Sequence, residues 1–313
     1  MSHFKKILVI DKMHPSINDV LEAIGYDCDY QPDITRAEII LKLSAYTGMI
    51  VRSKTFIDEA LLLNADKLKF VCRAGAGIDN VDMEVLSRKN ILLLNAPEGN
   101  RDALGEHTLG MLLMLMNKLN LADHEVRNLI WDRESNRGHE IKGKTVGIYG
   151  FGFMGSAVAE KLQGFDCELI AYDKYKTNYA PQYVTEVELE TFQKKAQIVS
   201  LHIPLTWETQ SLFDYAYLSK FKRIQYVLNM ARGEILPLID LYRLLIEGKI
   251  KGAALDVLEN EKFKTFLVEE HKIYQALFGL KQVVFSPHVA GWTDESYERI
   301  NIILAKKISQ ANF

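Results

Sequence analysis

Short apolar runs alternate with amphipathic segments over the first third of the chain. The runs are rich in β-branched residues and leucine, and they comprise Ile7 to Ile10, Met49 to Val51, Leu68 to Cys72 and Ile91 to Leu94. Strands that are buried on both faces of a parallel sheet have this pattern, because the intervening helices cover each face. We therefore predict a first α/β domain with a doubly wound parallel sheet.

The same alternation starts again near residue 145. The second set comprises Thr145 to Tyr149, Glu168 to Tyr172, Ile198 to Ile203, Tyr226 to Leu228, Ala253 to Val257 and Val283 to Phe285. Six such strands predict a second doubly wound sheet. The expected fold class is α/β with two such domains, in keeping with 313 residues at roughly 150 residues per domain.

Two helical segments help to place the domain boundaries. Glu106 to Leu121 is long and almost continuously apolar, so we expect it to pack against a domain or a second subunit. After Pro287, apolar residues at helical spacing predict a final amphipathic helix. Because the second sheet is complete by then, this helix should cross back to the first domain. We expect one domain of residues 1–98 and 289–313, and another of residues 99–288.

Composition and charge exclude several classes of protein. Hydrophobic residues make up 48% and charged residues 25%, as in ordinary globular proteins. The net charge of -3 gives no field that would attract nucleic acid or a membrane surface. Cys28, Cys72 and Cys167 have no metal-binding spacing and fit a reducing compartment. No apolar stretch is long enough to span a membrane, so we expect a cytoplasmic protein without a metal.

A G-x-G-x-x-G sequence, formed by Gly150, Gly152 and Gly155, joins a predicted strand to a predicted helix. Glycines in this position permit a tight turn and let backbone amides and the helix N-terminus approach a pyrophosphate. We include the intervening Phe153 and Met154 among the cofactor-binding residues. The loop therefore predicts a dinucleotide cofactor.

Asp173 ends the next predicted strand. An acidic side chain there accepts hydrogen bonds from ribose hydroxyls and repels a 2′-phosphate, which favours NAD over NADP. Lys174 and Lys176 lie beside it and leave NADP open.

Polar segments follow other predicted strands, at the sheet edge where open α/β sheets bind ligands. In the second domain they contain an arginine, a glutamate and a histidine, which are the side-chain types that a dehydrogenase needs. The segments are Val51 to Thr55, Arg73 to Asn80, Asn229 to Gly233, Asp256 to Glu261 and Ser286 to Gly291.

Over nearly its whole length the chain resembles the D-isomer-specific 2-hydroxy-acid dehydrogenases. The resemblance implies a Rossmann NAD-binding domain, a discontinuous flavodoxin-like substrate domain and a homodimer formed through the long helix near Glu106. It is carried by Arg73 to Asn80, Asn95 to Pro97, Gly99-Asn100, Gly105 to Thr108, the glycine loop, His202 to Thr206, Asn229 to Gly233 and Ser286 to Gly291.

The resemblance also implies catalytic roles for His288, Glu261 and Arg232. Hydride arrival at a ketone carbon leaves an alkoxide, so a protonated imidazole near that oxygen removes the charge as it forms. Glu261 should orient the ring of His288 and favour its protonated form. Arg232 presents a planar fork that matches the substrate carboxylate.

Further contacts follow from the same resemblance. The amides of Ala76 and Gly77 would hold the substrate carboxylate from the other domain, and Asp256 would bind the nicotinamide carboxamide. The remaining expected cofactor contacts are His202, Pro204, Thr206, Ala231 and Gly291.

The substrate is an anionic 2-hydroxy acid whose identity stays open between two readings. Arg52, Ser53, Arg73 and Arg133 lie in segments similar to those of family members that act on 3-phosphoglycerate, and several guanidiniums suit a phosphate dianion. This favours a short 3-phosphoglycerate dehydrogenase of serine biosynthesis, without the C-terminal regulatory domains of longer relatives. Alternatively, the arginines make structural salt bridges and the enzyme reduces glyoxylate or hydroxypyruvate.

A different class of function is an NAD-sensing corepressor, which occurs within the same fold family.

The chain departs from the family at three positions. Phe153 stands where relatives often have a polar residue, Lys262 follows Glu261 where proline is common, and Trp292 is bulkier than its usual counterpart. Trp292 could therefore narrow the pocket or cap it.

Overall fold

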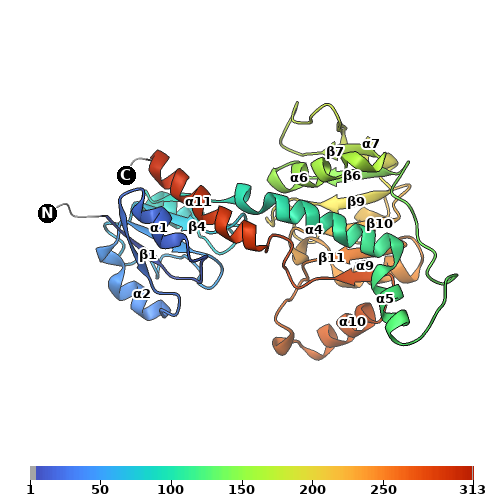
Figure 1. Ribbon diagram of the computed structural model, residues 1–313, viewed down its shortest axis with the longest axis horizontal. Coiled ribbons are helices and arrows are strands. Elements are labelled where there is room, and N and C mark those ends of the chain that lie inside the picture. Colours follow the sequence, from blue (N-terminus) through green and yellow to red (C-terminus); the bar gives the residue numbers. More distant parts are fainter. Residues whose placement is uncertain (1–4, 312) are drawn as a thin grey trace. The chain divides into compact units, whose positions relative to one another are not determined.

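The computed structural model describes residues 5–311 and 313, and it divides into two compact units. Unit 1 comprises Met1–Arg101 and Trp292–Phe313, and unit 2 comprises Asp102–Gly291 (Figure 1). The first unit therefore extends to residue 101 rather than 98, and the second ends at residue 291 rather than 288. The C-terminal segment belongs to unit 1, as the order of the predicted strands required.

Unit 1 is built on a five-stranded parallel sheet with the order β2-β1-β3-β4-β5. Four of its strands coincide with the predicted apolar runs, but β2 was not predicted. It lies at the edge of the sheet and has the sequence Tyr-Asp-Cys-Asp-Tyr, which contains no apolar run. The strands are β1 (Lys5–Val9), β2 (Tyr26–Tyr30), β3 (Gly48–Val51), β4 (Phe70–Arg73) and β5 (Leu92–Asn95).

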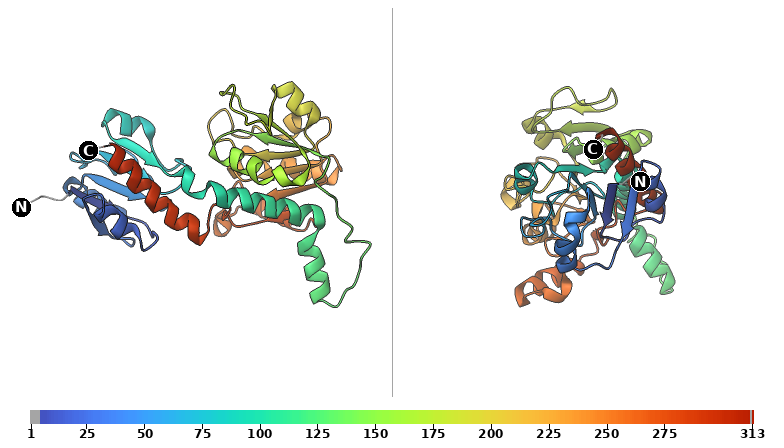
Figure 2. Two further views of the ribbon diagram at one scale, coloured as in Figure 1. Left: turned by 45° about the horizontal axis from the view of Figure 1, so that its top comes forward. Right: turned by 90° about the vertical axis from the view of Figure 1, so that its left-hand side faces the viewer.

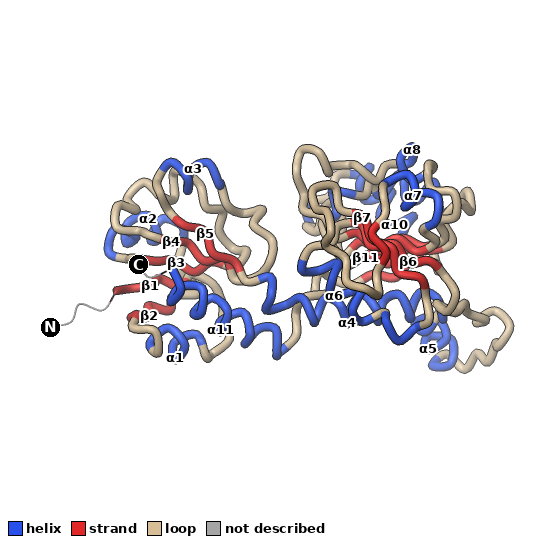
Figure 3. Tube along the Cα trace, turned by 90° about the horizontal axis from the view of Figure 1, so that it is seen from above, coloured by secondary structure: helices blue, strands red, loops and turns tan. Residues whose placement is uncertain are grey.

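Helices cover both faces of this sheet, as Figure 3 shows. Alternate residues of the strands point to opposite faces. Ile7 and Val9 therefore join one apolar cluster with helices α1 (Ile17–Glu22) and α11 (Asp294–Ala311). The other cluster contains side chains from α2 (Arg36–Lys42) and α3 (Met83–Arg88).

Unit 2 contains a seven-stranded parallel sheet with the order β12-β11-β10-β9-β6-β7-β8. The expected number was six. The additional strand, β8, has two exposed polar residues at the sheet edge and gives no hydrophobic signal. The strands are β6 (Thr145–Tyr149), β7 (Glu168–Tyr172), β8 (Thr185–Glu186), β9 (Ile198–Leu201), β10 (Tyr226–Asn229), β11 (Gly252–Leu255) and β12 (Val283–Phe285).

Two apolar clusters enclose this second sheet as well. One includes side chains from α4 (Pro97–Asn117) and α6 (Phe153–Lys161). The other includes side chains from α8 (Tyr215–Leu218) and the helices that follow β8, β10 and β11. These are α7 (Leu189–Lys195), α9 (Leu238–Ile246) and α10 (Val268–Phe278). Figure 2 shows the layers of the unit from two further directions.

The long apolar helix begins earlier and ends earlier than expected. Instead of continuing to Leu121, α4 ends at Asn117, because Lys118 adopts a left-handed conformation with φ 53°. A second helix, α5 (Leu119–Arg127), then starts in a new direction. No glycine or proline marks this break in the sequence. Within the described part of the chain, no helix is long and apolar enough to cross a membrane.

Candidate active site

The carboxyl ends of the unit 2 strands carry almost all the polar residues that the sequence singled out in this unit. The strand order reverses between β6 and β9, which is the position where open α/β sheets form a ligand-binding crevice. Gly150 follows β6, His202 follows β9, and Asp256 follows β11. These loops therefore meet at one edge of the sheet.

The glycine loop has the geometry that a dinucleotide needs. Gly150 has φ +92°, a conformation that favours glycine. A Cβ atom at Gly155 would overlap the carbonyl oxygen of Gly150, so the turn closes only without a side chain there. Gly152 caps α6, and no atom lies within 4 Å of where its Cβ would be. The open space at the N-terminus of this helix leaves room for a phosphate group.

Asp173 lies next to this loop and holds it. Its carboxylate accepts hydrogen bonds from the backbone amides of Phe151, at 2.9 Å, and Tyr175, at 3.0 Å. Both neighbouring lysines have partners of their own. Lys174 pairs with Glu208 at 2.6 Å, and Lys176 donates to the carbonyl of Phe151 at 2.9 Å. The ion pair with Glu208 offsets the charge of Lys174, whereas Lys176, bound to a neutral carbonyl, keeps its positive charge.

Four of the remaining expected cofactor residues lie after neighbouring strands of the same sheet. His202 accepts or donates a hydrogen bond with Ser200 at 2.7 Å, and burial lowers its pKa to about 3, so the ring is neutral. Pro204 and Thr206 are exposed on the loop that follows β9, whereas Ala231 is buried after β10. Gly291 is the last residue of unit 2.

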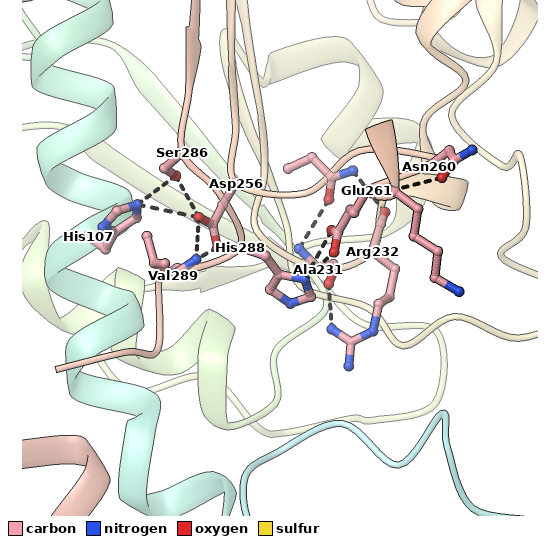
Figure 4. Close-up of polar contacts among 12 residues, drawn as sticks. His107, Ala231, Arg232, Asp256, Asn260, Glu261, Ser286, His288 and Val289 are labelled. Atoms are coloured by element: carbon pink, nitrogen blue, oxygen red, sulfur yellow. Dashed lines mark hydrogen bonds and ion pairs between the residues drawn. The ribbon is translucent and has the colours of Figure 1, made fainter. Parts of the chain in front are cut away.

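His288, Glu261 and Arg232 come together in unit 2, although they are far apart in sequence (Figure 4). Nδ1 of His288 lies 3.0 Å from each carboxylate oxygen of Glu261. Burial raises the pKa of Glu261, but the hydrogen bond from His288 and the charges of His288 and Arg232 outweigh it, so the pKa is lowered overall. The carboxylate is therefore held in its charged form beside the ring.

Asp256 fixes the loop that carries His288. Its carboxylate is 2% exposed and accepts hydrogen bonds from the backbone amides of Val289 and Ala290, each at 2.9 Å, and from the hydroxyl of Ser286. His107 of α4 also lies 3.6 Å from it. These contacts give Asp256 a positioning role for the loop, and its expected contact with the nicotinamide carboxamide stays a prediction.

The loop that carries Glu261 is also held at several points. The amide of Asn260 donates to the hydroxyl of Tyr274 at 2.7 Å, and its side-chain amide donates to Glu270 at 3.0 Å. The amide of Lys262 donates to the side-chain oxygen of Asn260 at 2.9 Å. A proline could not make this last bond, so hydrogen bonds here replace the stiffness of a ring.

A buried asparagine positions Arg232. Asn229 is 1% exposed, donates to the carbonyl of Arg232 at 2.9 Å and accepts from the amide of Ala231 at 3.1 Å. A side chain on Gly233 would overlap the carbonyl of Leu258, so this loop packs directly on the one after β11. The sequence drew attention to these loops but not to the supporting roles of Asn229, Asn260 and His107.

Unit 1 contains a surface pocket at the carboxyl ends of β1, β2 and β3. It is lined by Asp11, Lys12, Pro32, Asp33, Arg52, Ser53 and Lys54. The ammonium of Lys54 donates to the carbonyls of Pro32 and Ile34, each at 2.7 Å, and of Ile10 at 3.3 Å. Arg52 and Ser53 remain as the expected substrate residues in this pocket.

Arg73 folds back over its own loop. Its Nη1 lies 3.4 Å from the carbonyl oxygen of Ala74. A Cβ atom at Gly75 would overlap this Nη1. The backbone amides of Ala76 and Gly77 donate no hydrogen bond to any described residue. Two adjacent free amides can hold a carboxylate oxygen.

Arg133 belongs to unit 2, whereas the other expected substrate residues belong to unit 1. It is exposed on the segment that follows α5. This segment is anchored at the amino ends of the strands, because the amide of His139 donates to Met116 and its ring contacts Tyr226, the first residue of β10. The catalytic candidates lie at the opposite edge. The role of Arg133 in substrate binding stays a prediction.

Among the described residues, no group of three or more histidine, cysteine, aspartate or glutamate side chains could hold a metal ion.

Comparison with known proteins agrees with this geometry. Residues 109–290 match the sequence model of the family described as "D-isomer specific 2-hydroxyacid dehydrogenase, NAD binding domain". The chain is 32% identical over 312 residues to a D-3-phosphoglycerate dehydrogenase of Methanocaldococcus jannaschii, covering 97% of this chain and 57% of the relative. It is also 32% identical over 300 residues to the rat protein of the same name, covering 95% and 55%. The chain thus spans about half the length of these curated relatives.

Solved structures with the same fold extend the comparison. An acyclic imino acid reductase in complex with NADPH and D-arginine is 27% identical, with a TM-score of 0.85 over 98% of this chain and 96% of that chain. The D-lactate dehydrogenase of Aquifex aeolicus, solved with NAD and lactic acid, is 24% identical, with a TM-score of 0.82 over 97% and 94%. At that identity the second likeness concerns the fold alone.

Proposed function

Because the chain belongs to the D-isomer specific 2-hydroxyacid dehydrogenase family, we propose that it transfers a hydride between NAD and C2 of an anionic 2-hydroxy acid. The single observation that carries this proposal is the contact between His288 and Glu261 next to Arg232. A proton carrier, its carboxylate partner and a guanidinium at the carboxyl edge of a nucleotide-binding sheet are the groups that this reaction requires.

The residues of unit 2 fit a bound dinucleotide. The space beside Gly152 and the N-terminus of α6 would accept the pyrophosphate, and Asp173 would accept hydrogen bonds from the adenosine ribose. When bound, NAD supplies the two-electron acceptor of the reaction. The pairing of Lys174 with Glu208 supports NAD over NADP.

His288 would move the proton that accompanies hydride transfer. In the direction of oxidation its neutral ring accepts the hydroxyl proton of the substrate, and in reduction the protonated ring returns it. Glu261 holds Nδ1, which leaves the other ring nitrogen for the substrate oxygen. Arg232 would bind the carboxylate next to C2 through its planar fork.

We propose 3-phosphoglycerate as the substrate, with 3-phosphohydroxypyruvate as the oxidised product. Arg52 and Ser53 line a polar pocket in unit 1. Relatives named D-3-phosphoglycerate dehydrogenase are 32% identical to this chain over 97% and 95% of its length, which includes the pocket. Glyoxylate or hydroxypyruvate is the second candidate, because neither needs a partner for Arg52. The NAD-sensing corepressor would need no proton carrier, and the His288–Glu261 contact argues against it.

We also propose that the chain forms a homodimer. Exposed apolar side chains gather on α5 and the segment after it, where Leu129 is 96% and Trp131 is 80% exposed. Apolar groups exposed together in this way mark protein interaction surfaces. A second copy seated here could also receive Arg133, which lies on the same segment and cannot reach the catalytic residues of its own chain.

A substrate panel tests the proposed function. Initial rates are measured with NAD and NADP for 3-phosphoglycerate, glycerate and D-lactate, and with both reduced nicotinamides for hydroxypyruvate and glyoxylate. We expect the highest kcat/KM with 3-phosphoglycerate and NAD. Tight NAD binding without turnover of any member would favour a binding protein instead.

A further inference from the structure

Three side chains from distant parts of unit 1 form a stack at the surface pocket. The guanidinium carbon of Arg52 lies 3.4 Å from the centre of the Trp292 ring and 5.3 Å from that of Tyr297. The two rings are themselves stacked, 5.6 Å apart at an angle of 25°. His14 packs its ring edge against Tyr297 at 5.9 Å, which anchors the far end of the stack.

The guanidinium of Arg52 is held by these faces and not by an ion pair. Within the described part of the chain, no carboxylate or carbonyl oxygen accepts a hydrogen bond from its N–H groups. Asp11 lies close, but it accepts a hydrogen bond from the backbone amide of Arg52. Burial lowers the pKa of Arg52, against the opposing influence of Tyr297 and Asp11. A half-buried arginine whose donor edge has no internal acceptor is unusual in a purely structural role.

We propose that Trp292 and Tyr297 form an aromatic platform that fixes Arg52 as the binding group for the distal phosphate of the substrate. Stacking uses the faces of the guanidinium and leaves its donor edge free for a bidentate contact. Because the side chain is already ordered, less conformational entropy is lost when an anion binds. Trp292 thereby acts as a positioning residue for substrate specificity.

The surroundings of the stack favour a phosphate group over an apolar one. Ser53 and Lys12 line the same pocket and can add donors. Asp11 and Asp33 line the pocket too, and their negative charges oppose an anion, so the direct contact with Arg52 has to supply the attraction. The inference rests on the proposed function, because only a phosphorylated hydroxy acid carries such a group at the end remote from C2.

Substitution of the platform tests the positioning role. Trp292→Leu should raise the KM for 3-phosphoglycerate by about two- to thirtyfold, which is the range of a cation–π contact, with a much smaller effect on kcat. The kcat/KM for glyoxylate, which has no distal anion, should fall far less. Trp292→Phe keeps an aromatic face and should recover part of the loss. Equal losses for both substrates would overturn the proposal.

A double-mutant cycle separates positioning from general damage to the fold. If Trp292 acts through Arg52, then Trp292→Leu should have almost no further effect on the KM in an Arg52→Ala background. Additive effects would show that the ring acts independently of the guanidinium. Both variants are also compared by thermal unfolding, so that a loss of stability is seen separately.

A binding measurement tests the platform without turnover. The chain has three tryptophans, and Trp131 and Trp207 are 80% and 86% exposed, so Phe at either position loses no packing within the chain and keeps an aromatic ring at the proposed dimer surface. In a Trp131→Phe, Trp207→Phe protein, titration with inorganic phosphate should change the fluorescence of Trp292, and Arg52→Ala should abolish the change. If phosphate changes the fluorescence neither with Arg52 nor with Arg52→Ala, the platform is refuted. A response without turnover of 3-phosphoglycerate would refute the proposed substrate and keep the anion site.

Discussion

His288 has a backbone conformation that few residues adopt. Its φ of +56° lies in the left-handed region, which costs a non-glycine residue about 1–3 kcal/mol at sites where it is held in place. The surrounding contacts supply this constraint, because its amide donates to the carbonyl of Asp256 and the next two amides donate to the Asp256 carboxylate. The loop thus presents the imidazole to Glu261 at the expense of backbone strain.

His288→Asn is the sharpest substitution at this position, because asparagine tolerates the left-handed region but carries no titrating proton. We expect kcat to fall about 10²- to 10⁴-fold, the usual contribution of a general acid–base group. NADH binding, followed by fluorescence, should be nearly unchanged. The exposed His271 provides a matched control, since His271→Asn should retain the rate. A normal rate in His288→Asn would refute the proton-carrier role.

The lowered pKa of Glu261 sets the pH dependence of the pair. Because the carboxyl pKa of Glu261 is lowered, the pair contributes its full stability above the ordinary pKa of a glutamate, about 4.3. This stability is lost only as the pH falls through the lowered pKa. Across the neutral range the ring of His288 therefore faces a negative charge. Glu261→Gln removes that charge while keeping a group of the same size.

We expect the pH profile of ketoacid reduction by Glu261→Gln to shift on its alkaline side toward lower pH. The neutral amide favours the protonated ring less than a carboxylate does, so the active form is lost earlier as pH rises. The measurement is kcat/KM for the ketoacid between pH 5 and pH 9. Glu259→Gln, on the same loop, is the control. An unshifted profile would show that Glu261 does not influence the proton carrier.

At the scale of elements, the sequence predicts the apolar strands, including the edge strands β5 and β12, and misses the two polar edge strands, β2 and β8. Interior strands such as β6 and β9 are buried on both faces and therefore consist of apolar runs. The edge strands β2 and β8 contain exposed polar residues, and only their neighbours decide that they pair. The break at Lys118 is likewise invisible, because no glycine or proline marks it.

The final helix shows how a predicted amphipathic pattern becomes stability. In α11 the side chain of Leu304 is fully buried in the apolar cluster with α1, whereas Ile302 is 49% exposed. Leu304→Ala should lower the free energy of unfolding by about 2–5 kcal/mol, because it leaves a cavity. Ile302→Ala on the same helix should change it by only about 0.5 kcal/mol. Urea unfolding measures both, and similar losses would mean that α11 is not packed as described.

For the whole molecule, the sequence predicts which residues are the candidate catalytic groups, but it does not predict the contacts that support them. Conspicuous polar residues after buried strands identified His288 and Arg232, since parallel strands bring their carboxyl ends together. The inward role of Asp256 depends on loop geometry that no spacing encodes. The placement of Arg133 depends on where α4 ends, which the sequence does not mark.

The dimer proposal makes the position of Arg133 testable with two defective proteins. One carries His288→Asn and keeps Arg133, and the other carries Arg133→Ala and keeps His288. Each alone should oxidise 3-phosphoglycerate poorly, the second through a raised KM. If Arg133 serves the site of a second copy, a mixed dimer contains one site with both an intact His288 and an intact Arg133.

Unfolding and refolding the two proteins together should therefore restore low-KM activity to about one quarter of the wild-type sites, because about half of the dimers are mixed and each has one complete site. The same mixture with Trp131→Asp added to both chains places a charge in the exposed apolar surface and should give monomers and no restoration. Sedimentation measures the assembly and initial rates measure the activity. Restoration by monomers, or none by dimers, would contradict a shared site.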